Sequence, residues 1–263
     1  MSEIVRADLW QGLRCFTSAR IALGCAGSSL PTAEVLRLGL AHAKARDAVH
    51  RPLDVALLED GVRTLSWPVL RVHSRAPDRA TYLLRPDLGQ RLGDASVALL
   101  TEQANKAFDI LFVLADGLSP IAVQHHALPL LQSVKPLLPT AWSVAPVVIA
   151  EQSRVALGDE VGELLRVQTV VVIIGERPGL SSPDSLGIYL TFAPKIGRTD
   201  AERNCISNIR PEGLAYAEAA RKLAWLLGEA RRRQLSGVRL KDSSRLVESS
   251  PAAAAMLSRP SVN

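Results

Sequence analysis

The first third of the chain shows helical spacing of hydrophobic residues and few signs of strands. A proline and a threonine precede the segment Ala33–Val49, in which Leu36, Leu40 and Ala43 recur at helical intervals. This spacing predicts an amphipathic helix with one buried stripe. We expect residues 1–90 to form a helical N-terminal region with irregular connections.

The pattern changes after about residue 90, where short apolar runs alternate with longer helical segments. The clearest run, Val170–Ile174, has β-branched residues throughout, which is typical of a buried strand. Further runs also predict strands at Ile110–Leu114, Val144–Ile149 and Gly187–Phe192. The segments between them predict helices at Asp94–Ala107, 120–137 and Gly158–Leu165.

The order of these elements indicates the fold class. Strands that alternate with helices pair in parallel through right-handed crossovers. A last helix, Leu214–Gln234, has an apolar face, and Gly237 is placed to end it. We therefore predict an α/β fold with a mostly parallel sheet over residues 91–242. Residues 243–263 are rich in serine, proline and alanine without apolar periodicity, which predicts a disordered tail.

Composition and charge narrow the functional classes. The chain is 48% hydrophobic but only 4% aromatic, which suits the aliphatic core of a parallel sheet. Its apolar runs are too short to cross a bilayer, and its first residues lack the apolar stretch of a secretory signal. The net charge of +5 is dispersed among acidic residues, so we predict no nucleic-acid partner. The chain has 3 cysteines, an odd number without metal-ligand spacing, which favours a reducing, cytosolic compartment.

Polar or glycine-containing loops follow three predicted strands at their carboxyl ends, where open parallel sheets bind ligands. Asp116 follows the first strand, Glu151 follows the second, and Glu176 begins a long loop after the third. This loop, residues 175–185, combines glycines, prolines and serines, which predicts a defined shape. Two interpretations of Glu176 stay open, a ligand contact or an ion pair with Arg177 or another arginine.

Several established signatures of catalysis and nucleotide binding are missing. The chain has no glycine-rich dinucleotide fingerprint, no P-loop and no nucleophile elbow. The neighbours His125 and His126 lie on one predicted helix, where adjacent side chains do not face a single metal ion. Cys205 has no histidine beside it, so we expect a small buried side chain rather than a nucleophile. We predict no metal site.

The residues so far leave two other classes open. One is an α/β oxidoreductase or transferase that acts alone, against which the missing nucleotide fingerprints count. The other is a basic scaffold or nucleic-acid-binding module, against which the dispersed charge counts. A cofactor absorbance spectrum tests the first class, and salt-dependent binding tests the second.

Two long segments resemble the small subunit (light chain) of ethanolamine ammonia-lyase. They are GERPGLSSPDSLGIYLTFAP at Gly175–Pro194 and GRTDAERNCISNIRPEG at Gly197–Gly213. Shorter stretches agree with this resemblance at Ala19–Gly24, Leu40–His50, Tyr82–Gly89 and Ala115–Ser119. The likeness extends from about residue 8 to about residue 240, and the separation of GERPGL from CISNI makes it specific.

This resemblance implies a Rossmann-like subunit that packs against a barrel-type large subunit in a hetero-oligomer, with adenosylcobalamin between the two. The family's holoenzyme converts ethanolamine to acetaldehyde and ammonia through an adenosyl radical. By motif, the resemblance implies cobalamin contacts at Val155, Glu176 and Cys205. Because the cofactor carries the radical chemistry and the protein positions it, we assign no catalytic residue to this chain.

Two expectations concern the binding mode and the location. No histidine has an aspartate two residues before it, so the DxHxxG motif that replaces the cofactor's own base is absent. We therefore expect the base-on mode, as the resemblance also implies. Family members that enter bacterial microcompartments often carry a longer N-terminal extension, whereas this sequence begins almost at the common region. The expected location is a bacterial microcompartment or the free cytoplasm.

Overall fold

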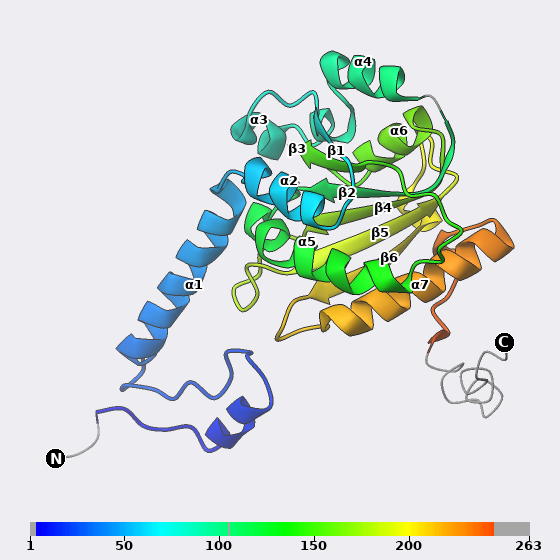
Figure 1. The fold of residues 1–263 in the computed structure, drawn as a ribbon. Coiled ribbons are helices and arrows are strands. Elements are labelled where there is room, and N and C mark those ends of the chain that lie inside the picture. The colour runs from blue at the N-terminus through cyan, green and yellow to red at the C-terminus, as the bar shows by residue number, and fades with distance from the viewer. Residues whose placement is uncertain (1–3, 105, 245–263) are drawn as a thin grey trace, which may run out of the picture.

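A computed structural model of the protein describes residues 4–104 and 106–244, with a six-stranded sheet at its centre (Figure 1). The strand order is β1-β3-β2-β4-β5-β6. Strands β1, β3, β2 and β4 run parallel to one another. Strand β5 is antiparallel to β4, and β6 is antiparallel to β5. The predicted α/β fold with a mostly parallel sheet is therefore confirmed. The strands are β1 (Val69–His73), β2 (Phe108–Ala115), β3 (Val147–Glu151), β4 (Val167–Gly175), β5 (Leu186–Phe192) and β6 (Arg203–Ile209).

Helices cover both faces of this sheet. One apolar core joins α2, α5 and α7 to one face, and a second core joins α4 and α6 to the other. Neighbouring residues of β4 divide between the cores, since Val171 faces α5 and α7 while Val172 faces α4 and α6. This two-sided burial explains why β4 reads as a continuous apolar run. The helices are α1 (Thr32–His50), α2 (Val55–Thr64), α3 (Arg79–Leu84), α4 (Asp94–Gln103), α5 (Pro120–Val134), α6 (Leu157–Leu164) and α7 (Tyr216–Arg233).

Two strands lie where the sequence predicted none. β1 falls inside the segment expected to be helical and irregular, and β6 contains Cys205. Both are edge strands whose sequences, VLRVH and RNCISNI, mix polar and apolar residues. The predicted parallel pairing does not extend to β5, which is antiparallel to β4. The loop between these two strands contains no crossover helix, and parallel pairing needs such a connection.

The predicted buried stripe of α1 is wrong. Leu36 and Leu40 are 68% and 57% exposed, whereas the buried residues of α1 are Glu34, Ala41 and Ala48. Figure 1 shows the reason, since α1 projects from the layered part of the molecule and carries the preceding segment at its far end. The helix forms as its spacing predicts, but most of it has no neighbour in the described chain to cover its apolar residues.

The last long helix largely follows the prediction. The apolar positions of α7 are buried, among them Ala220, Leu223, Leu227 and Ala230. The helix ends earlier than expected, because Gln234 takes the left-handed conformation at φ 54° and Gly237 falls in a later turn. Most of the predicted tail, residues 245–263, lies outside the described residues. Within the described part of the chain, no helix is long and apolar enough to cross a membrane.

Candidate functional site

A cleft of about 450 Å³ opens at the carboxyl ends of β2, β3 and β4. The parallel alignment of these strands brings their following loops to one edge, as the sequence predicted. Val155 and Glu176, two of the sequence-predicted site residues, both line this cleft. The full lining is Tyr82, Gly117, Leu118, Arg154, Val155, Ile174, Gly175, Glu176, Arg177 and Tyr189.

The third predicted residue, Cys205, lies beside the cleft. It stands opposite Tyr189 in the antiparallel register of β5 and β6, so the two side chains share one face of the sheet. Cys205 is exposed, and the expectation of a buried side chain is therefore wrong. Its thiol nevertheless lies against Tyr189, and partial burial raises the pKa of this thiol, which keeps it protonated at neutral pH.

The Glu176 carboxylate is held by donors from two separate segments. Ser185 Oγ donates to Oε2 over 2.6 Å, and the backbone N–H of Asn208 donates to both oxygens over 3.3 and 3.2 Å. Among the ion pairs of the described residues, none includes Glu176, so the arginine interpretation is not observed. Gly187 leaves room for the carboxylate, because a Cβ there would lie 3.0 Å from Oε1. Each oxygen keeps acceptor capacity for a ligand.

A buried carboxylate shapes the turn that leads to Val155. Asp116 is 2% exposed and accepts the backbone N–H groups of Gln152 and Ser153, each over 2.8 Å. Arg79 Nη1 also donates to it over 3.3 Å. Burial raises the pKa of Asp116 to about 6, although Arg79 and the backbone donors oppose this rise. Gln152 adopts a positive φ of 52°, a strained conformation that its bond to Asp116 helps to hold.

One aromatic side chain, Tyr82, and one cationic side chain, Arg154, form the neighbouring wall of the cleft. Tyr82 is fully buried and donates its hydroxyl to the Ser153 carbonyl over 3.0 Å. The Arg154 guanidinium lies 4.4 Å from the centre of the Tyr82 ring. Within the described residues, Arg154 Nε and Arg79 Nη2 are buried without a hydrogen-bond partner. Sequence reasoning missed these residues, because neither arginine belongs to a recognisable motif.

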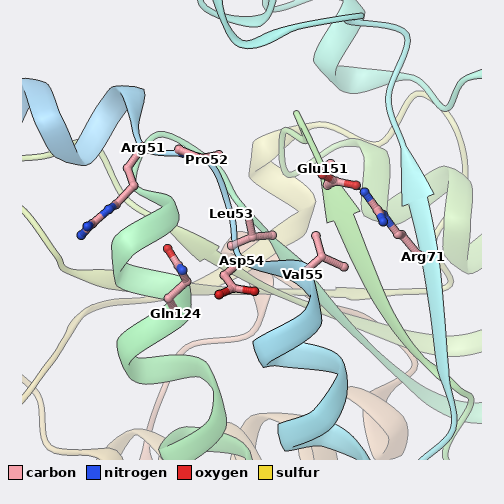
Figure 2. Close-up of a pocket in the computed structure, with 8 residues that line it drawn as sticks. All are labelled: Arg51, Pro52, Leu53, Asp54, Val55, Arg71, Gln124 and Glu151. Carbon is pink, nitrogen blue, oxygen red and sulfur yellow. The ribbon is translucent and has the colours of Figure 1, made fainter.

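A second cleft, of about 700 Å³, lies near the ends of β1 and β3 (Figure 2). Its two carboxylates are already engaged. Glu151, which the sequence placed at a strand end, accepts Arg71 Nε over 2.7 Å, and Asp54 accepts the backbone N–H of Leu57 at the start of α2. In Figure 2 the Arg71 and Glu151 side chains point toward one another. Val155, Glu176 and Cys205 are absent from its lining, so the cleft beside Glu176 is the better candidate.

Comparisons with known proteins identify the family to which the chain is similar. The family model described as ethanolamine ammonia-lyase light chain (EutC) matches residues 7–241. The chain is 57% identical over 239 residues to the ethanolamine ammonia-lyase small subunit of Azotobacter vinelandii, with 89% of this chain and 88% of the relative covered. It is 56% identical to the small subunit of Xanthomonas campestris pv. campestris, with 90% and 89% covered, and 54% identical to that of Ralstonia nicotianae, with 91% and 90% covered.

These matches span nearly the whole described fold and include both motif segments around Glu176 and Cys205. Ethanolamine ammonia-lyase is a carbon–nitrogen lyase that uses adenosylcobalamin, and it joins its small subunit to a large one. On this evidence, the chain belongs to the family of ethanolamine ammonia-lyase small subunits.

Proposed function

We propose that this chain forms the small-subunit wall of the adenosylcobalamin site, with Val155, Glu176 and Cys205 as the residues that contact the corrin. The observation that carries this proposal is the position of the Glu176 carboxylate, which is fixed at the rim of the cleft with acceptor capacity to spare. The bound cofactor supplies the radical chemistry that converts ethanolamine to acetaldehyde and ammonia. The residues of this chain bind and orient the cofactor.

The polar groups of the cleft suit the rim of a corrin ring. The rim carries amide side chains, which need both acceptors and donors, and an ionised carboxylate is a strong acceptor. Glu176 offers that acceptor, while Arg154 Nε is a buried donor without a partner among the described residues. A buried unpaired donor is costly, by about 1–3 kcal/mol, so a ligand carbonyl at this position is favoured.

The size and shape of the cleft favour a shared site. A cleft of about 450 Å³ accommodates one side of a molecule as large as cobalamin, so the rest of the cofactor needs a second surface. Tyr189 and Cys205 extend the cleft along one face of β5 and β6, where a broad, flat ligand can approach closely. A large subunit that covers this face completes the enclosure. This arrangement supports a hetero-oligomer with the cofactor at its interface.

The described residues offer no constellation for acid–base or radical chemistry in the cleft, so we propose that the chain has no activity alone. The test is co-expression with the large subunit and purification with adenosylcobalamin. We expect acetaldehyde from ethanolamine only when both subunits and the cofactor are present. Turnover by the small subunit alone contradicts the proposal, and so does a purified two-subunit complex that retains no cobalamin.

We also propose a domain boundary near residue 51. The boundary predicted from the sequence, at residue 90, would separate β1 from the rest of the sheet. In the structure β1 pairs with β3, and α2 packs on the same core as α5. A boundary after α1 keeps these elements together. Limited proteolysis tests it, with a first cleavage between residues 50 and 54 expected.

Two locations are proposed, a bacterial microcompartment and the free cytoplasm. The family's part in ethanolamine degradation favours the first. Co-sedimentation of the protein with shell particles distinguishes the two locations.

A further inference from the structure

The loop between β4 and β5 meets α5 through a cluster of one aspartate and two histidines. His125 and His126 come from α5, and Asp184 comes from the loop. One ligand atom from each residue lies within 4.8 Å of the other two. His126 Nε2 and Asp184 Oδ2 are 3.6 Å apart. These residues lie outside the lining of the cleft described above.

The buried histidine has one occupied ring nitrogen and one free one. His126 is only 5% exposed, and its Nδ1 lies 2.7 Å from the Tyr216 hydroxyl. Its Nε2 is buried and has no hydrogen-bond partner among the described residues. The 3.6 Å separation from Asp184 is too long for a hydrogen bond. This separation between the ring nitrogen and the carboxylate oxygen leaves a position for a bridging ion.

We propose that His125, His126 and Asp184 bind a divalent cation of the zinc class. Zinc bonds imidazole nitrogen and carboxylate oxygen at about 2.0–2.1 Å, so neighbouring ligand atoms of a tetrahedral ion lie roughly 3.4 Å apart. The separation of His126 from Asp184 is close to this value. Two imidazoles and one carboxylate are a donor set that zinc, cobalt and nickel ions accept. The fourth position is open to water.

The surroundings of His126 suit a metal ligand. When Nδ1–H donates to the Tyr216 oxygen, the lone pair of Nε2 points toward Asp184, and such a hydrogen bond commonly orients metal-bound histidines.

This inference departs from the expectation that adjacent histidines on one helix do not share a metal. That expectation considered the helix alone, whereas the third ligand comes from a loop nearly sixty residues away in sequence. The two histidine rings lie edge to face, with 5.8 Å between their centres. Pro129, inside α5, has no N–H to bond the His125 carbonyl, which loosens the helix at this turn.

A cation at this position would fasten the loop to α5. Asp184 directly precedes Ser185, whose hydroxyl donates to Glu176, and the neighbouring Pro183 carbonyl already accepts Ser119 Oγ over 2.9 Å. Metal binding is thus expected to order residues 176–185. The idea that an ordered loop helps to bind the cofactor rests on the proposed function. The proposed cation binding is independent of that function.

The test uses the complete two-subunit complex without cobalamin, treated with a chelator and then titrated with Zn²⁺ or Co²⁺. Variants His125→Gln and Asp184→Asn each remove a ligand, the first at an exposed and the second at a half-buried position, and His42→Gln is the matched control on α1. We expect the wild type and the control to bind the metal with the same affinity. The two ligand variants should bind it at least about tenfold more weakly, since even outer residues of metal sites have effects of this size.

Two further measurements identify the site. Bound Co²⁺ should give visible absorption bands that the ligand variants lose, and Zn²⁺ should slow amide hydrogen exchange in residues 176–185. Equal metal uptake by the wild type and both ligand variants overturns the proposal, as does no uptake by the wild type. Because cobalamin is absent from every arm, failure here is distinct from failure of the proposed cofactor site.

Discussion

The Glu176 carboxylate accepts the backbone N–H of Asn208, which ties the end of β4 to the end of β6 across the intervening strand β5. The Ser185 hydroxyl supports the same carboxylate from the start of β5. These bonds position the carboxylate at the rim of the cleft before a ligand arrives. Such preorganisation lowers the entropy lost on binding.

The substitution Glu176→Gln should weaken cobalamin binding in the two-subunit complex by about ten- to a hundredfold. Charge-assisted hydrogen bonds contribute about 1.5–3 kcal/mol, and about 1.4 kcal/mol corresponds to a tenfold change in affinity. The free energy of unfolding of the cofactor-free chain should fall by only about 1 kcal/mol, because the internal bonds to Ser185 and Asn208 weaken. Cobalamin titration and urea unfolding measure the two effects.

Ser185→Ala is the matched control for this variant. It removes one internal donor to Glu176 but keeps the charge at the cleft, so it should reproduce the stability loss with a much smaller loss of cobalamin affinity. If Glu176→Gln binds cobalamin as tightly as the wild type, Glu176 is not a cofactor contact.

Gly187→Ala should displace the Glu176 carboxylate without changing any charge. The added methyl group would lie 3.0 Å from Oε1 and 3.2 Å from Cγ of Glu176, so that side chain must move. We expect several-fold weaker cobalamin binding, while the free energy of unfolding changes by at most about 1 kcal/mol, since the disturbed bonds of Glu176 oppose the gain from a more restricted unfolded chain. Wild-type affinity in this variant would show that the exact carboxylate position is unimportant.

Asp116→Asn should change how stability depends on pH. The pKa of Asp116 is raised to about 6 from 3.8 by burial, so between these values the folded chain binds a proton that the unfolded chain does not. Its contribution to stability therefore falls as pH rises through about 6, by on the order of 3 kcal/mol in total. Asparagine does not titrate and lacks this dependence.

Urea unfolding of both proteins between about pH 4 and about pH 7 measures the effect. The wild-type free energy of unfolding minus that of Asp116→Asn should decrease with rising pH. An increase would mean that Arg79 and the backbone donors outweigh the burial of the carboxylate.

Cys205 should report on the occupancy of the cleft through its reactivity. Its raised pKa lowers the thiolate fraction, so alkylation should be slow at neutral pH and accelerate as pH rises. Bound cobalamin should slow it further, by about tenfold, because the cofactor would cover the exposed residue. Peptide mass spectrometry of the complex with and without cofactor measures the rate, with Cys15 as the internal control. Equal rates at Cys205 in both samples would place the cofactor elsewhere.

The sequence by itself determined the central part of the fold. The β-branched run in β4 and the apolar face of α7 gave clear signals, because both elements are buried along their length. It also predicted the edge at which the candidate cleft opens, since parallel strands bring their carboxyl ends together. The motifs around Glu176 and Cys205 indicated the family, which the comparisons confirmed.

Only the tertiary structure decided which distant residues meet. The edge strands β1 and β6 are defined by their pairing partners, and Leu36 is exposed because nothing in the described chain covers α1. Three contacts join segments that are distant in sequence. The Asn208 N–H donates to Glu176, the Ser153 N–H donates to Asp116, and Asp184 lies close to His126. Local periodicity records how each element is buried, whereas such contacts depend on how the elements are arranged around the sheet.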